Sequence, residues 1–130
     1  MTTTTATVET TTAQTRRTPG WGYGLATAVV AAAATSIVAA LIRAAGVDLT
    51  VDGEPIPILG FAQLVMISAV IGLVLARYVR RTTFLRVTIT LTPLSCIPSL
   101  AWGTTAGDKV GLVCTHLVAA AIIIPRYARR

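Results

Sequence analysis

Few side chains in this sequence are of types that could do chemistry. His116 is the one ionisable group set well inside an apolar run. We expect this side chain to be a packed, neutral histidine hydrogen-bonded to a hydroxyl of the third apolar segment. The alternatives are a proton relay, a quinone contact or haem ligation. A haem held by paired axial histidines would need two copies of the chain, so we expect no haem.

The two thiols, Cys96 and Cys114, lie nine residues before and nine residues after Thr105. If Thr105 centres the turn of an antiparallel helical hairpin, both thiols lie at one depth. A disulfide then becomes possible, provided that the Cα atoms come within about 7 Å. The alternative is that both are free thiols packed as small apolar residues. The chain lacks the C-x-x-C spacing of redox enzymes.

Hydroxyl side chains recur at helical spacing along one segment. Together with an amide and the histidine they form a candidate polar cluster: Gln63, Thr88, Thr92, Ser95, Ser99 and His116. Such a stripe could line a polar cavity. Because Pro93 and Pro98 each leave a backbone carbonyl without its donor, the hydroxyls could instead satisfy those carbonyls within the protein.

Several chemistries are not favoured. The apolar runs hold no Asp, Glu or Lys away from their ends, whereas a small proton-coupled transporter needs a buried carboxylate. No nucleophile-elbow, phosphate-loop, dinucleotide or zinc-protease motif occurs. One histidine and two cysteines fall short of a four-ligand zinc site. We expect no enzyme, no metal and no cofactor.

Composition identifies the elements that must position these residues. The 130-residue chain is 54% hydrophobic and 12% charged, with a mean hydropathy of +0.74, which is typical of an integral membrane protein. Four apolar runs, at about 23–43, 58–78, 85–102 and 108–125, predict an all-α, four-helix transmembrane bundle within residues 21–127. Residues 1–20 contain ten threonines and predict a disordered tail.

The first run is long enough to cross a membrane. Residues 23–42 carry no charge over twenty positions, which at 1.5 Å per residue spans a core of about 30 Å. A cleaved signal sequence is the alternative. Small residues recur every fourth position and predict a helix-packing seam, inside the bundle or between copies: Gly20, Gly24, Ala28, Ala32, Ser36, Ala40 and Ala44.

Residues 46–58 differ from the rest of the chain. Asp52 and Gly53 are a two-residue turn signal between alternating apolar residues, which predicts a short β-hairpin. The turn would set Val51 opposite Glu54, Leu49 opposite Ile56 and Val47 opposite Ile58. Prolines keep the strands short, and the apolar face should rest on the helix ends. Asp48, Asp52, Gly53 and Glu54 form the candidate recognition loop. Its carboxylates fall short of a calcium site.

Basic residues predict the orientation. Nine of the eleven lie in the tail, between the second and third runs, or at the C-terminus, and Arg43 and Lys109 are the other two. The positive-inside rule therefore predicts that both termini lie in the cytoplasm, that residues 46–58 face outward, and that any homo-oligomer is parallel. The basic residues flank membrane spans, so we expect no nucleic-acid binding.

The whole pattern resembles an uncharacterised family of small four-span membrane proteins from high-GC Gram-positive bacteria. The resemblance rests on Gly46-Val47, on residues 51–57, on Gly60-Phe61 and on the arginine-rich middle loop, and it implies topology but no activity. We therefore expect a non-enzymatic protein of the inner membrane that contacts the bilayer and a membrane-protein partner or a second copy. The alternatives are a small transporter or channel subunit, and a redox or quinone-linked component.

Overall fold

The computed structural model of the chain describes residues 19–129, so the expected tail falls almost wholly outside the described residues. The described part consists of four helices and a small sheet: α1 (Trp21–Ala44), β1 (Thr50–Val51), β2 (Glu54–Pro55), α2 (Ile58–Tyr78), α3 (Arg81–Trp102) and α4 (Ala106–Ala128). The third and fourth helices begin a few residues before the apolar runs that predicted them. α3 continues through Pro93 and Pro98 without a break.

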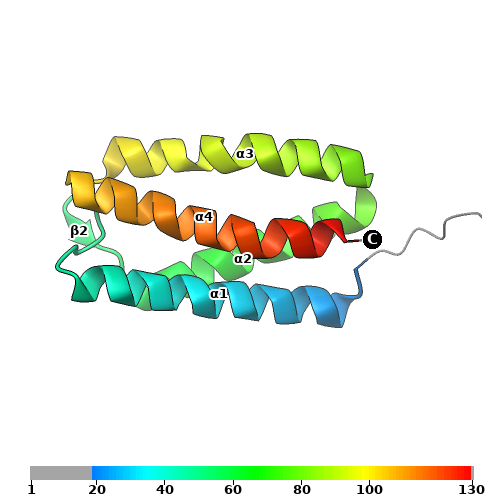
Figure 1. Cartoon of the computed structure of the whole chain (residues 1–130), viewed down its shortest axis with the longest axis horizontal. Helices are drawn as coiled ribbons and strands as arrows, with labels where there is room; N and C mark the ends of the chain where they lie inside the picture. The colour runs from blue at the N-terminus through cyan, green and yellow to red at the C-terminus, as the bar shows by residue number, and fades with distance from the viewer. Residues whose placement is uncertain (1–18, 130) are drawn as a thin grey trace, which may run out of the picture.

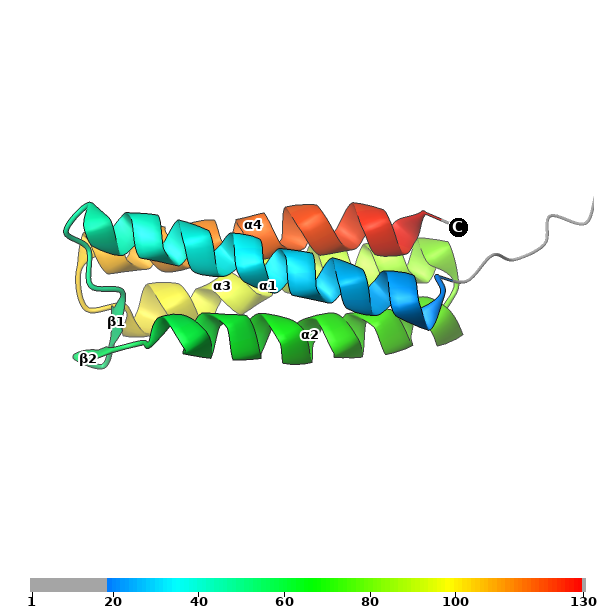
Figure 2. The ribbon, with the colours of Figure 1, turned by 90° about the horizontal axis from the view of Figure 1, so that it is seen from below.

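The helices run side by side and form an elongated bundle (Figure 1). The hairpin β1–β2 and the α3–α4 turn lie at one end, which we call the capped end. The start of α1, the α2–α3 turn and the end of α4 lie at the opposite end, which we call the arginine end (Figures 1 and 2). Loops that are far apart in the sequence therefore meet at the capped end.

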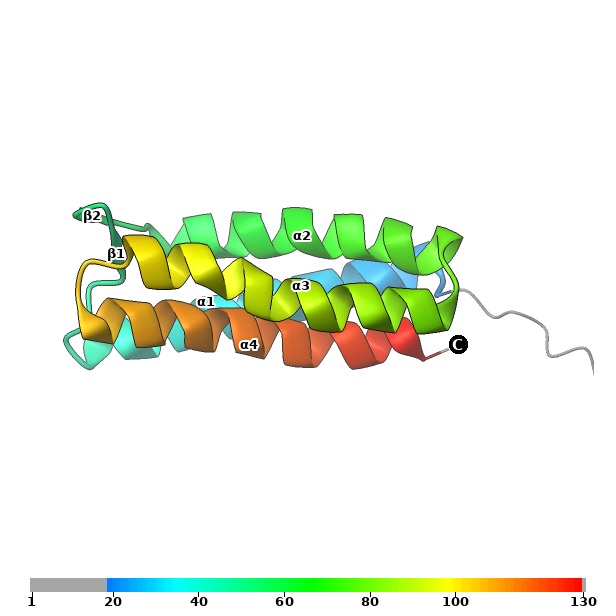
Figure 3. The same cartoon turned by 90° about the horizontal axis from the view of Figure 1, so that it is seen from above.

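α1 and α4 carry most of the packing. α1 lies against both α2 and α4, and α3 lies mainly against α4, as Figures 2 and 3 show. α2 and α3 follow each other directly in the chain but make few contacts with each other. Most of the surface of these two helices therefore faces outward.

The outward surface is apolar on all four helices. Large exposed side chains include Leu41 on α1, Leu59 on α2, Ile89 on α3 and Val110 on α4. A soluble bundle would bury such a surface, whereas a membrane protein turns it to lipid. All four helices are long and apolar enough to cross a membrane. The four-helix architecture is therefore confirmed.

The small-residue seam of α1 lies inside the bundle, but its face shifts along the helix. Gly24, Ala28 and Ala32 are buried as predicted, and a Cβ at Gly24 would collide with the side chain of Leu73. Toward the capped end, however, Thr35 and Ala39 are buried while Ala44 is exposed. The reason is that residues four apart are about 400° apart around the helix axis, so their row drifts by about 40° for every four residues.

Two separate groups of buried side chains stabilise the two ends of the bundle. At the arginine end, Leu73, Ala76, Phe84, Tyr127 and Ala128 pack together. At the capped end the group consists of Ala39 from α1, Leu49 from the hairpin loop, Phe61 from α2 and Leu112 from α4. The loop between α1 and α2 therefore contributes a core residue.

Candidate recognition surface

The turn of the hairpin forms at the predicted residues. Asp52 and Gly53 both have positive φ, +52° and +83°, as a two-residue hairpin turn of type I′ requires. Val51 pairs with Glu54, and the Ile56 amide donates to the Leu49 carbonyl at 3.3 Å. The predicted turn and the closeness of Leu49 to Ile56 are confirmed.

The strands are shorter than the alternating pattern predicts. Each has two residues, and the predicted pair of Val47 with Ile58 is wrong because Ile58 is already the first residue of α2. Leu49 adopts a left-handed backbone, with φ of +55°, which ends the extended conformation on one side. Pro55 and Pro57 cannot donate to a ladder on the other side.

The underside of the hairpin rests on the helix ends. Leu49 is fully buried, and Val47, Val51 and Ile56 pack around the same group of core residues. Leu49 fits against Gly111 of α4, where an added Cβ would lie 2.5 Å from the Leu49 Cδ2 atom. The absence of a side chain at Gly111 therefore makes room for the loop.

Asp108, at the start of α4, fixes the hairpin to the bundle. Its side chain is only 2% exposed and accepts four hydrogen bonds. Two come from the Thr50 amide and hydroxyl, at 3.2 and 2.8 Å, and two from the Thr105 amide and hydroxyl, at 2.9 and 2.8 Å. All four partners are donors, which suits a carboxylate because an ionised carboxylate only accepts. One buried side chain thus joins the start of α4 to β1.

The α3–α4 turn also contacts the hairpin directly. The Asp52 amide donates to the Trp102 carbonyl at 3.2 Å, and the Gly53 amide donates to the Thr104 hydroxyl at 3.2 Å. Val51 forms an isolated bridge with Gly103. The turn residues of the hairpin are therefore held in place on the bundle.

Arg43 ties the two ends of the loop to α1. Its guanidinium group donates to the Asp48 carbonyl at 3.2 Å and to the Ile56 carbonyl. Asp48 precedes the hairpin and Ile56 follows it, so one side chain bridges the entry and the exit of the loop. Arg43, Asp48, Pro55 and Pro57 line a shallow open depression beside it.

The acidic residues of the loop differ in burial from the apolar residues beside them. Asp48, Asp52 and Glu54 are exposed, whereas the apolar residues between them are buried or half-buried. Within residues 19–129, no group of three His, Cys, Asp or Glu side chains is placed to hold a metal ion. Three exposed carboxylates therefore belong to a loop that hydrogen bonds hold on the bundle.

Sequence reasoning missed Asp108 as a functional residue. The signal was present: Thr105 and Asp108 have the spacing of a capping box, in which each side chain bonds to the backbone amide of the other. The structure shows both bonds at the start of α4. The additional bonds from Thr50, 58 positions away, have no local sequence signal.

Three hydroxyls of the candidate polar cluster bond within α3. The hydroxyls of Thr88, Thr92 and Ser95 donate to carbonyls of α3 itself, at 2.7–3.2 Å. Ser99 is buried and Gln63 is exposed on α2.

His116 also bonds within its own helix, through a 2.9 Å contact between Nδ1 and the Leu112 carbonyl. The predicted bond from this histidine to a hydroxyl of the third span is therefore wrong, because the partner is a backbone carbonyl one turn earlier on the same helix.

The hydroxyl bonds of α3 differ in detail from the expectation. The carbonyls without a donor are those four residues before each proline, Ile89 and Leu94. The observed acceptors are instead Phe84, Leu85, Thr88 and Thr92. The hydroxyls of α3 therefore donate to carbonyls other than the two that the prolines leave without a donor.

Cys96 and Cys114 are free thiols, so the possible disulfide is not formed. Cys96 is buried and its thiol lies 3.4 Å from the Thr92 carbonyl, whereas Cys114 is exposed. Although α3 and α4 are antiparallel neighbours, the two cysteines lie in different surroundings.

The arginine end has its own fixed contacts. The Tyr127 hydroxyl is buried and donates to the Gly24 carbonyl at 2.9 Å, which joins the end of α4 to the start of α1. Arg77 lies over the Trp21 ring, 5.3 Å from its centroid, and donates to the Pro19 carbonyl at 3.2 Å. These contacts join the start of α1 to the end of α4 and to the end of α2.

Four apolar helices with an apolar exterior define a multi-pass membrane protein. The chain belongs to a family of unknown function, DUF6069, which matches residues 15–130. This match confirms the resemblance to an uncharacterised family. No curated protein and no solved structure matches the chain.

Proposed function

We propose that the chain is a non-enzymatic protein of the cytoplasmic membrane that recognises a protein partner through its hairpin. Both termini lie in the cytoplasm and the capped end faces outward. The observation that carries this proposal is the buried attachment of an exposed acidic loop by Asp108. A loop that is already fixed loses little conformational entropy on binding, so its contacts contribute more fully to affinity.

The distribution of charge supports the orientation. Arg77, Arg80, Arg81, Arg126 and Arg129 lie at the arginine end, whereas the described acidic residues lie at the capped end. An excess of arginine marks the cytoplasmic side of a membrane protein.

Cysteine labelling tests the orientation. In a chain with Ala at positions 96 and 114, a single cysteine is introduced by Glu54→Cys or by Thr82→Cys, both at exposed positions. A maleimide that cannot cross membranes should label the first variant in intact cells and the second only after lysis. The opposite pattern would invert the orientation.

Photo-crosslinking in native membranes tests the recognition surface. A photoreactive residue at Glu54 should give a discrete crosslinked product, whereas one at Leu64, on the exposed apolar face of α2, should not. Asp108→Asn, which loosens the hairpin, should reduce the product at position 54. Equal products at both positions, or none at Glu54, would contradict recognition through the hairpin.

The transporter and redox alternatives receive no comparable support. A polar path needs Gln63, the α3 hydroxyls and His116 around one cavity, yet the hydroxyls and the histidine bond within their own helices. The redox alternative used the cysteine pair, which is not bonded.

A further inference from the structure

The arginine end carries positive charge that the described chain does not neutralise. The described acidic residues, Asp48, Asp52, Glu54 and Asp108, all belong to the capped end. At a rise of 1.5 Å per residue, a helix of 21 residues such as α2 separates the two ends by about 30 Å, far beyond the screening length of about 8 Å at physiological salt. No carboxylate of the described residues therefore compensates the positive charge at this end.

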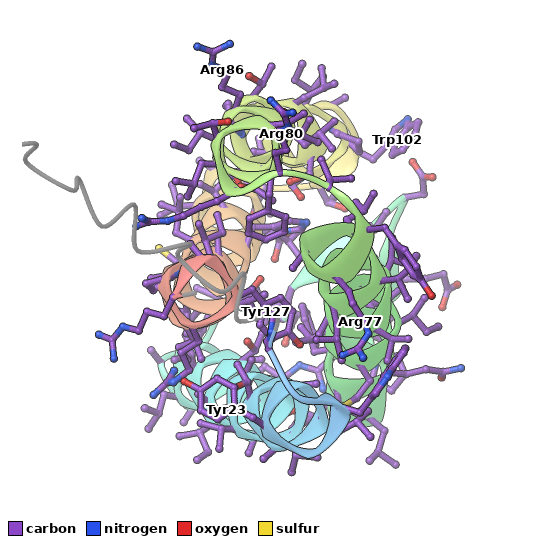
Figure 4. All side chains as sticks on the ribbon, turned by 90° about the vertical axis from the view of Figure 1, so that its right-hand side faces the viewer. Tyr23, Arg77, Arg80, Arg86, Trp102 and Tyr127 are labelled. Atoms are coloured by element: carbon purple, nitrogen blue, oxygen red, sulfur yellow. The ribbon has the colours of Figure 1, made fainter. Side chains whose placement is uncertain are left out.

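The arginines of this end fall into two groups. Arg77 and Arg126 are half-buried and donate to the carbonyls of Pro19 and Ile122, at 3.2 and 3.3 Å. By contrast, Arg80, Arg81 and Arg86 are exposed at the start of α3. Figure 4 looks onto this end and shows Arg80 over the start of α3, with Arg86 pointing outward from the same helix.

The position of Arg86 along α3 favours a lipid headgroup over a dissolved anion as its ligand. It lies five residues after Arg81, so its Cα is about 7.5 Å further along the helix, toward the apolar part of α3. The exposed rings of Trp21, Tyr23 and Tyr78 lie at the same end and are residue types that gather at the membrane interface. A long arginine side chain at this depth extends toward the headgroup layer.

We propose that Arg86 binds the phosphate of an anionic phospholipid whose acyl chains lie along the side of α3 that carries Ile89 and Ile97, and that Arg80 and Arg81 add positive charge at the start of the same helix. Arginine binds phosphate through paired N–H donors, and an anionic lipid supplies the missing negative charge. Ile89 and Ile97 follow Arg86 by three and eleven residues, so they provide exposed apolar surface on the same side of the helix. This surface lies at the opposite end from the hairpin, and its test does not depend on the orientation proposed above.

Native mass spectrometry of the full chain in detergent tests this proposal, because it resolves individual bound lipids. Phosphatidylglycerol is titrated against the protein, with phosphatidylcholine as the neutral reference. We expect the protein to bind phosphatidylglycerol more tightly, and Arg86→Gln to weaken that binding about fivefold. Arg129→Gln removes the same charge from an exposed position on the same end and should change it by less than about twofold.

Two further arms separate the site from its alternatives. Arg86→Lys keeps the charge without the paired donors and should retain more affinity than Arg86→Gln. An excess of inorganic phosphate should leave the lipid bound. Equal binding of the two lipids, an equal loss in the position 86 and position 129 variants, an equal loss in both Arg86 variants, or displacement by phosphate would overturn the proposal.

Discussion

Asp108 joins the hairpin to the start of α4 through buried hydrogen bonds. Asp108→Asn keeps the size of the side chain but replaces one acceptor oxygen by a donor, which then faces the donors of Thr50 or Thr105. We expect the free energy of unfolding in detergent to fall by about 2–3 kcal/mol, the cost of leaving a buried polar group unsatisfied. Denaturant titration followed by circular dichroism measures this change.

The matched control is Asp52→Asn. It removes the same charge from the exposed turn, where asparagine also tolerates a positive φ. This control should stay within about 0.5 kcal/mol of the parent protein. A similar loss in both variants would mean that charge alone, and not the buried bonds, stabilises the cap.

Gly111 makes a second residue-scale prediction. Gly111→Ala places a Cβ 2.5 Å from the Leu49 side chain and should destabilise the protein by about 1–3 kcal/mol, the typical cost of overpacking. Gly22→Ala, on the exposed part of α1 with no atom within 4 Å of the new Cβ, should stabilise it by about 0.5–1 kcal/mol. Thermal unfolding of both variants gives opposite shifts; shifts of the same sign would contradict the close packing of Leu49.

At the scale of the element, the hydroxyl side chains of α3 donate to carbonyls of the same helix. Thr92 donates to the Thr88 carbonyl at 2.7 Å, so Thr92→Val, which keeps the shape and removes the hydroxyl, takes away a bond that the helix does not need. The unfolding free energy should change by less than about 0.5 kcal/mol. A loss well above that value, measured by the same denaturant titration, would show that the hydroxyl has a partner outside α3.

The elements differ in how much of them the sequence predicts. The helices follow from length and hydropathy, and the hairpin turn follows from Asp52 and Gly53, because two adjacent positive φ angles need such residues. The sequence also predicts that the hairpin rests on the helix ends, but not the hydrogen bonds that attach it there. Thr50 and Asp108 are 58 residues apart, and the left-handed backbone of Leu49 breaks the rule that leucine avoids this region.

The candidate polar cluster shows what residue spacing cannot predict about hydrogen-bond partners. Helical spacing correctly places Thr88, Thr92 and Ser95 on one helix, but spacing does not say whether a hydroxyl bonds to another helix or to the preceding turn. The nearest acceptor in each case is the carbonyl three or four residues earlier. A short side chain reaches that carbonyl first.

At the scale of the whole molecule, the two ends of the bundle are stabilised separately. Tyr127 and Asp108 lie 19 residues apart on α4, which is about 28 Å along the helix. Tyr127→Phe removes a buried bond to the Gly24 carbonyl and should lower the unfolding free energy by about 1 kcal/mol.

The double variant with Asp108→Asn should show the sum of the two losses within about 0.5 kcal/mol, because the sites share no partner. Tyr23→Phe, an exposed hydroxyl on the same end, is the neutral control. Equilibrium unfolding of the set measures the coupling. A coupling well above this value would mean that the bundle responds as one unit along its length.

The bond between Thr50 and Asp108 also constrains the order of assembly. Synthesis completes α1, the hairpin and α2 before the start of α4 exists, so the hairpin must wait for 58 further residues before its buried partner arrives. Until then the Leu49 side chain has no α4 to pack against. The buried bonds that close the cap can therefore form only after the start of α4 has been synthesised.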